Sequence, residues 1–164
     1  GYMNPFYHFG MEKFLQKAEE YNIQGTIIPD LPFEMAQNYD ELFKKYNKSN
    51  ISFVAPTDSE ERIKEIVSDA KKFIYMVAYA GITGSGQKED LSQIIENVRK
   101  YSQTPLYIGF GVDENTCKEK AQNVDGVIVG SAFVKHIIDD SLSNSEKIKK
   151  ISSIAKEIKD KINE

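Results

Sequence analysis

Two glycine-rich turns in the second half of the sequence carry the residue types that bind phosphate groups. GFG at 109–111 and GS at 130–131 each end a short apolar run, and each leads into a segment with helical spacing. Glycine has no Cβ, so backbone N–H groups in such turns can approach an anion closely. The stretch GITGSG at 81–86 would add a third donor, from Gly84, in the preceding loop. One such turn would predict only a change of chain direction, but the set predicts a phosphate site.

The other residue types that often do chemistry occur outside any motif. His8 and His136 lie far apart, and neither HExxH nor a paired Cys/His spacing occurs, so no metal site is expected. Cys117 is the only cysteine and is expected to be structural, on an outer helix. A single cysteine excludes an internal disulfide and favours a reducing, cytoplasmic setting. Asp30 is the one acid that follows an expected strand inside a distinctive stretch, IIPDLP.

The elements that must position these residues alternate along the chain. Five short apolar runs rich in β-branched residues are expected to be buried strands. They lie at 25–30, 51–56, 73–81, 105–111 and 126–130. Charged segments with helical periodicity lie at 11–21, 33–46, 59–72, 88–101 and 145–162, and the isoleucines of the last are expected to face the core. This alternation predicts βαβ units with a parallel sheet. No linker or composition break occurs, so residues 1–164 are expected to form a single domain.

Two parallel architectures are compatible with this order. A doubly wound sheet would place a glycine-rich turn after its first strand, whereas the glycines here follow the last two expected strands. A (β/α)8 barrel frequently builds a phosphate site from the loops after its seventh and eighth strands. Such a barrel typically needs about 250 residues, and the chain has 164.

Composition argues against two classes of partner. The net charge is −4 and the isoelectric point lies near 5.3, which disfavours nucleic acid because phosphate neutralisation needs a basic face. No apolar run approaches the ~18 residues of a membrane span, so no membrane partner is expected.

The chain resembles the tryptophan synthase α subunit family over nearly its whole length. The matching stretches occur in the family's order and spacing. They are YMNPF at 2–6, IIPDLPFE at 27–34, FVAPT at 53–57, ERIKEI at 61–66, IYMVAYAGITG at 74–84, IGFGV at 108–112 and DGVIVGSAFVK at 125–135.

This resemblance implies a (β/α)8 barrel, present here as a partial barrel of about five βα units. It implies retro-aldol cleavage of indole-3-glycerol phosphate to indole and glyceraldehyde 3-phosphate, by acid–base chemistry without a metal or an organic cofactor. It also implies an α2β2 complex, in which indole passes to a β subunit that uses pyridoxal phosphate.

The resemblance further implies that the principal acid and base are not in these 164 residues. In the family, a glutamate on the second strand and an aspartate in a PFSDP-type loop transfer the protons, and no such loop occurs here. The chain would then correspond to the carboxy-terminal five-eighths of the barrel. We therefore expect the 164 residues to be inactive alone.

The same resemblance assigns roles to particular positions. Tyr75 and Asp30 are implied to be supporting catalytic residues. For Tyr75 the alternative is a core tyrosine bonded to backbone, and for Asp30 it is a cap for the helix that follows. The implied substrate-binding residues are Tyr2, Thr83, Gly84, Gly109, Phe110, Gly111, Gly130 and Ser131. The implied contacts with the β subunit are Asn4, Pro5 and Pro32. The loop at 81–90 is implied to close as a lid, although YA at 79–80 departs from the polar or basic residue usual there.

Two further interpretations stay open at this stage. The glycine turns alone also fit another phosphate-binding barrel enzyme, such as a sugar-phosphate epimerase or a prenyl-phosphate synthase. The chain could also be a non-catalytic half-barrel that binds a phosphate or a partner.

Overall fold

The structure is a computed structural model that describes residues 1–78 and 91–164. The chain divides into two compact units, which are described separately below. The first contains residues 1–54, 58–75 and 97–104, and the second contains residues 55–57, 76–96 and 105–164. That residues 1–164 form a single domain stays a prediction.

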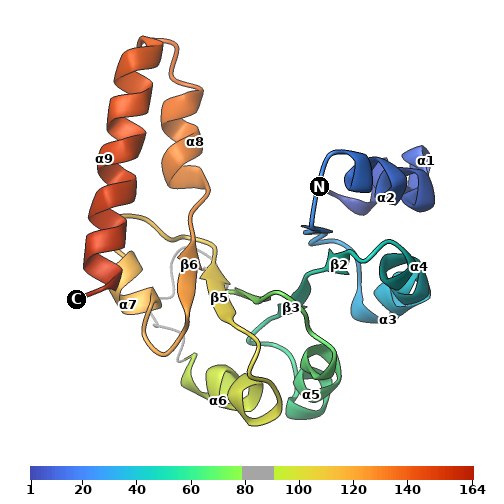
Figure 1. Ribbon diagram of the computed structural model, residues 1–164. Helices are drawn as coiled ribbons and strands as arrows, with labels where there is room; N and C mark the ends of the chain where they lie inside the picture. The colour runs from blue at the N-terminus through green and yellow to red at the C-terminus, as the bar shows by residue number, and fades with distance from the viewer. Residues whose placement is uncertain (79–90) are drawn as a thin grey trace. The chain divides into compact units, whose positions relative to one another are not determined.

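The first unit carries short helices and very short strands (Figure 1). Its elements are α1 (Met3–Phe9), α2 (Met11–Glu20), β1 (Gly25–Thr26), α3 (Phe33–Ala36), the 3-10 helix η1 (Gln37–Tyr39), α4 (Asp40–Lys45), β2 (Ser49–Asn50), β3 (Ser52–Val54) and α5 (Glu60–Ser68). Strand β4 (Ile74–Val77) and helix α6 (Ser92–Tyr101) each lie partly in both units. Strands β1 and β2 run parallel, with Gly25 paired to Ser49 and Thr26 to Asn50.

The second unit contains β5 (Leu106–Gly109), α7 (Cys117–Lys120), β6 (Gly126–Ile128), α8 (Ser131–Ile137) and α9 (Asn144–Ile162). Strands β5 and β6 are parallel neighbours, and Gly109 pairs with Ile128. The strands hydrogen-bond in the orders β1-β2 and β3-β4-β5-β6. The expected alternation of helices and parallel strands is confirmed.

Each unit has an apolar cluster that explains its helix periodicity. In the first unit, Met11 and Leu15 of α2 pack with Ile28, Leu31 and Phe43, all of them buried. The spacing of four residues between Met11 and Leu15 places both on one face of the helix.

In the second unit, Cys117 is fully buried with Val112 and Ile158, which agrees with a structural role. The isoleucine stripe of α9 faces this cluster only in its second half. Ile154 and Ile162 pack against the cluster, but Ile148 is 67% exposed. The prediction of a core-facing stripe is therefore wrong at Ile148.

Several expected elements differ from the structure, and the strand expected at 25–30 is only the two-residue β1. The segment 33–46, predicted as one helix, is divided into α3, η1 and α4. Asp40 and Glu41 lie in the first turn of α4, and Lys44 and Lys45 lie in its last. These charges complement the dipole of a new helix and favour a start at this point. The apolar run at 51–56 forms only β3, and the polar pair Ser49–Asn50 forms a strand that hydrophobic patterning does not predict.

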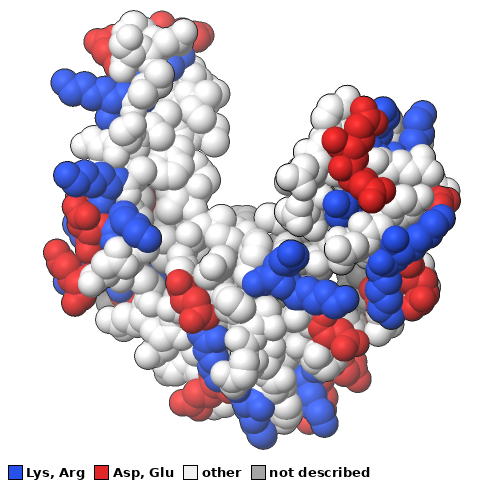
Figure 2. All heavy atoms as spheres, viewed as in Figure 1, with Lys and Arg blue, Asp and Glu red and all other residues white. Residues whose placement is uncertain are grey.

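Charges on the surface are mixed in sign. On the face drawn in Figure 2, basic and acidic side chains are interspersed over the helices. Several form exposed ion pairs, such as Lys17 with Glu20 at 2.6 Å and Lys118 with Glu164 at 2.8 Å. Pairs of this kind add little to stability, at most about 1 kcal/mol each. No helix within the described residues is long and apolar enough to cross a membrane.

Candidate functional site

The pairing of β5 with β6 brings the two glycine turns together. Gly109 is the last residue of β5 and lies opposite Ile128, the last residue of β6. Because parallel strands end at the same edge of a sheet, the turns that follow lie side by side. One turn contains residues 109–111 and the other contains residues 130–131. The amide N–H of Ala78 at the end of β4 also donates to the Gly109 carbonyl, at 3.0 Å.

The first of these turns has an unusual backbone. Phe110 has φ +77° and Gly111 has φ +62°, so both residues are left-handed. That conformation suits glycine but strains a bulky residue such as phenylalanine. The Phe110 side chain is 61% exposed, so core packing does not account for the strain. Strained residues of this kind cluster at ligand sites, where the surrounding structure holds them.

The second turn leaves room for a ligand. Gly130 has a negative φ of −117°, and no described atom lies within 4 Å of the position that a Cβ would take. Ser131 follows as the first residue of α8 and is exposed. The first N–H groups of a helix have no partner within it, but in α8 the Phe133 N–H already donates to the Gly130 carbonyl at 2.9 Å. This turn therefore offers backbone donors, and the Ser131 hydroxyl, beside open space.

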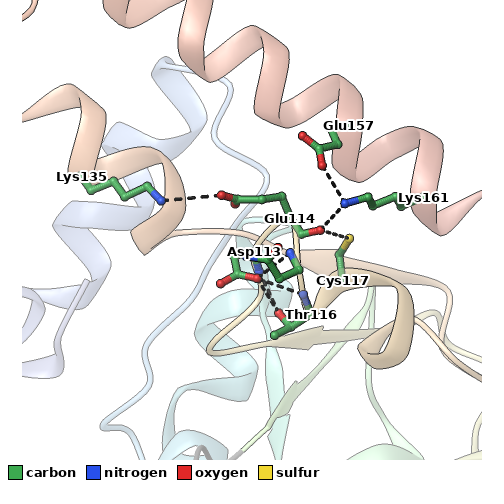
Figure 3. Close-up of polar contacts among 8 residues, drawn as sticks. Asp113, Glu114, Thr116, Cys117, Lys135, Glu157 and Lys161 are labelled. Carbon is green, nitrogen blue, oxygen red and sulfur yellow. Dashed lines mark hydrogen bonds and ion pairs between the residues drawn. The ribbon is translucent and has the colours of Figure 1, made fainter.

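A hydrogen-bonded loop follows the first turn (Figure 3). The Asp113 carboxylate accepts from the N–H groups of Asn115 at 2.9 Å and Thr116 at 3.0 Å, and the Asp113 N–H donates to the Thr116 hydroxyl at 3.0 Å. These bonds, led by that of the Asn115 amide, hold the pKa of the Asp113 carboxyl below its usual value. The loop is therefore capped like a helix start.

The Asp113 cap predicts a pH-dependent loss of stability in Asp113→Asn. We expect this substitution to lower the free energy of unfolding by about 1 kcal/mol at neutral pH, because the N–H groups would then donate to a neutral amide oxygen instead of a charged carboxylate. The carboxyl has a lowered pKa in the folded state, so its contribution is present well above 3.8, the ordinary value, and is lost as the pH falls through the folded-state pKa. Urea unfolding at several pH values checks this, with Asp140→Asn as the charge-matched control. A difference that persists unchanged in acid would contradict it.

Charged residues of α8 and α9 also contact this loop (Figure 3). Lys135 of α8 lies 3.9 Å from Glu114 Oε1, while Glu114 Oε2 is buried without a hydrogen-bond partner among the described residues. Lys161 of α9 donates to the Glu114 carbonyl at 2.7 Å and pairs with Glu157 at 2.6 Å. No motif signals the two contacts with Glu114 in the sequence, because the partners lie 21 and 47 residues apart.

In the first unit, Tyr75 of β4 stacks on Phe53 of β3. The ring centroids are 5.0 Å apart and the planes differ by 23°. Partial burial raises the pKa of the Tyr75 phenol above its usual value of 10.0, so the hydroxyl is neutral at physiological pH. No described group hydrogen-bonds to this hydroxyl, so the alternative of a backbone-bonded core tyrosine is not seen within the described part of the chain.

Asp30 caps a helix other than the one that follows it. Its carboxylate accepts from the Met3 N–H at 2.7 Å, at the start of α1. The helix after Asp30 is α3, whose N-cap is Pro32, and it has no side-chain cap among the described residues. The alternative of a cap for the following helix is therefore wrong. The Met3 contact joins the loop after β1 to the start of α1. Helix α1 carries the exposed residues Asn4 and Pro5, and Tyr2, which precedes it, is 68% exposed.

Several predicted residues are not brought together here. Thr83, Gly84 and the pair at 79–80 lie outside the described residues. Tyr2, Asn4, Pro5, Asp30, Pro32 and Tyr75 belong to the first unit, whereas the two glycine turns belong to the second. A cavity of about 690 Å³ in the first unit contains none of the predicted residues; its lining includes Phe33, Phe43 and Lys48. Within residues 1–78 and 91–164, no group of three or more His, Cys, Asp or Glu side chains could hold a metal ion.

Comparison with known proteins gives a consistent family match. The family model described as tryptophan synthase alpha chain matches residues 1–163. The tryptophan synthase alpha chain of Wolinella succinogenes is 50% identical over 164 residues, which are 99% of this chain and 64% of that protein. The alpha chain of Petrotoga mobilis is 39% identical, and the match covers 97% of this chain and 63% of that one. The chain thus spans somewhat less than two thirds of the length of these relatives.

Solved structures give the same match. Tryptophan synthase subunit alpha from Campylobacter jejuni superposes with a TM-score of 0.82 at 34% identity, covering 93% of this chain and 62% of that one. The tryptophan synthase alpha chain of Legionella pneumophila superposes with a TM-score of 0.79 at 28% identity, covering 99% and 61%. The expected fold class, α/β of the (β/α)8 barrel family, is confirmed by these superpositions.

Proposed function

The chain belongs to the tryptophan synthase alpha chain family, and from this premise we propose that it acts in tryptophan biosynthesis as a carbon–carbon lyase. The proposed reaction is the retro-aldol cleavage of indole-3-glycerol phosphate to indole and glyceraldehyde 3-phosphate. The observation that carries the proposal is the meeting of two glycine turns at one edge of the β5–β6 pair. Phosphate is the common chemical feature of the substrate and one product, and these turns offer the donors that phosphate needs.

The proposed phosphate-binding residues lie at that edge. Phosphate is held by backbone donors near Gly109, Phe110, Gly111 and Gly130 and by the Ser131 hydroxyl. Thr83 and Gly84 are proposed to belong to a loop that closes over the substrate. Tyr2 is proposed to line the indole pocket.

The acid–base chemistry is proposed to need carboxylates that these 164 residues do not hold. Cleavage requires that indole C3 gains a proton and that the neighbouring glycerol hydroxyl loses one. Tyr75 presents a neutral phenol that can donate a hydrogen bond, and Asp30 is proposed to support the site from its mouth. Neither replaces a principal acid and base pair, so we propose that the 164 residues alone are inactive.

The proposed assembly is an α2β2 complex with a tryptophan synthase β subunit. Asn4, Pro5 and Pro32 are proposed to contact that subunit, and all three are exposed. The Asp30 bond to the Met3 N–H supports this, because it joins the two segments that carry these residues. Pyridoxal phosphate is proposed to belong to the partner only, and the setting to be cytoplasmic.

A binding experiment tests the substrate class. The chain is titrated with indole-3-glycerol phosphate and with its dephosphorylated counterpart. We expect saturable binding of the phosphorylated compound, at least ~10-fold tighter than that of the other, and competition by glycerol 3-phosphate. Equal binding of the two compounds would contradict the phosphate site. Binding of indole-3-glycerol phosphate no tighter than glycerol 3-phosphate would favour a different phosphate-binding barrel enzyme.

The open space at Gly130 gives a sharper prediction. We expect Gly130→Ala to weaken binding of glycerol 3-phosphate roughly tenfold, because the methyl group would enter the space proposed for phosphate. Stability should change by less than about 0.5 kcal/mol, since φ is negative and no described atom lies within 4 Å of the new Cβ. Calorimetric titration and urea unfolding of the same sample check both parts. A variant that binds normally, or one that unfolds, would contradict this placement.

A further inference from the structure

Two side chains hydrogen-bond to the carbonyl groups of the Phe110–Gly111 turn. Lys120, at the end of α7, donates from Nζ to the Phe110 carbonyl at 2.6 Å. The Thr116 hydroxyl lies 2.8 Å from the Gly111 carbonyl. That hydroxyl also lies 3.1 Å from Asp113 Oδ1, but it has only one proton to give, and the shorter contact assigns that proton to Gly111. Both carbonyls of the left-handed turn are therefore held.

The Lys120 ammonium also fills the space in which a side chain at position 111 would begin. A Cβ built on Gly111 would lie 3.0 Å from Lys120 Nζ. The positive φ of Gly111 already favours glycine. A Cβ at this position would also require the Lys120 ammonium to shift slightly from its place beside the Phe110 carbonyl.

Holding these carbonyls fixes the direction of the adjacent N–H groups. In a trans peptide the C=O and the following N–H point in opposite directions. Since the Phe110 carbonyl faces Lys120, the Gly111 N–H faces away from Lys120. Since the Gly111 carbonyl faces Thr116, the Val112 N–H likewise faces away from Thr116. The braced turn therefore presents two N–H groups on the side opposite α7.

We propose that Lys120 and Thr116 are positioning residues of the phosphate site, which orient the Gly111 and Val112 amides toward a bound phosphate. The inference rests on the proposed function. Neither residue needs to touch the ligand, because each acts through a backbone carbonyl. Partial burial lowers the pKa of the Lys120 ammonium, which agrees with a side chain that packs on the turn. The nearby carboxylates of Asp113 and Glu119 act in the opposite direction and raise this pKa.

Matched pairs of variants test this inference, with glycerol 3-phosphate as the probe. Lys120→Met and Thr116→Val keep the size of the side chain but remove the donor, and Thr116→Val also removes the acceptor of the Asp113 N–H. We expect each variant to bind the probe roughly five- to tenfold more weakly. Lys120→Arg and Thr116→Ser keep a donor and should bind within about twofold of the unsubstituted chain. Lys118→Met is the charge control, because it lies on the same short helix but its ammonium pairs with Glu164 at 2.8 Å. It should bind normally.

The outcomes separate this inference from the proposed function. If the unsubstituted chain does not bind glycerol 3-phosphate, the proposed function fails and this inference fails with it. If that chain binds and both Lys120→Met and Thr116→Val bind equally well, only the inference is overturned. If one variant fails to fold in urea titrations, the other pair decides the question. Weak binding by Lys120→Arg and Thr116→Ser as well would overturn the role of the donors and indicate a general loss of packing.

Discussion

Joining this chain behind the amino-terminal segment of the Wolinella succinogenes relative is expected to produce an enzyme that releases indole from indole-3-glycerol phosphate. The family resemblance places the two proton-transferring carboxylates in that segment, and the relative is 50% identical to this chain. General acid–base groups contribute typically ~10²–10⁴ to a rate, so the fusion should exceed the 164 residues alone by at least that factor. Indole release, followed by its absorbance or by coupling to a β subunit, measures the difference.

The control for this experiment is the same fusion with asparagine in place of the aspartate that the family resemblance implies in a PFSDP-type loop. It keeps the joined fold and loses one of the two carboxylates, so its activity should fall back toward that of the 164 residues. Indole release by the 164 residues alone would show that the acid and base lie within them, and Asp30 would then be the first residue to replace. An inactive fusion that still binds glycerol 3-phosphate would favour a phosphate-binding module.

The parts of the site that depend on local chemistry could be predicted from the sequence. Glycines at 109, 111 and 130 follow apolar runs, and strand pairing places them side by side. The order of helices and parallel strands follows in the same way from periodicity. The positions of these turns and the order of the elements can be predicted because the signal lies within a few adjacent residues, where residue type alone limits the backbone.

The parts that depend on distant contacts could not be predicted. Asp30 caps α1 through the Met3 N–H, across 27 residues of chain, and no local pattern distinguishes this from a cap for the following helix. Lys120 donates a hydrogen bond to the Phe110 carbonyl, ten residues earlier, although its position on a charged helix predicts only a solvated side chain. The strand Ser49–Asn50 is polar and exists because it pairs with Gly25–Thr26, so hydrophobic patterning gives no signal for it.

Because Gly25–Thr26 pairs with Ser49–Asn50, we expect a methyl group added at Gly25 to lower the free energy of unfolding more than one added at the other glycines that the structure describes. A Cβ on Gly25 would overlap the Ser49 carbonyl oxygen. That oxygen is part of the backbone of β2, so it cannot rotate away as a side chain could. We expect Gly25→Ala to lower the free energy of unfolding by about 3 kcal/mol, or ~100-fold in the unfolding equilibrium. The alternative is that β1 and β2 separate, which would also remove the Thr26 hydroxyl bond to Asn50 Oδ1, 2.9 Å long.

Urea unfolding of Gly25→Ala and Gly130→Ala side by side isolates this effect. Both variants add one methyl group to a glycine, but only the first meets a backbone atom of a neighbouring strand. A separated β1 would also release the loop that carries Asp30, so the Met3 amide should exchange faster with solvent in Gly25→Ala. Equal stability of the two variants would mean that β1 and β2 can move apart at little cost. In that case the Asp30–Met3 bond, rather than strand pairing, would be what fixes the start of α1 against this loop.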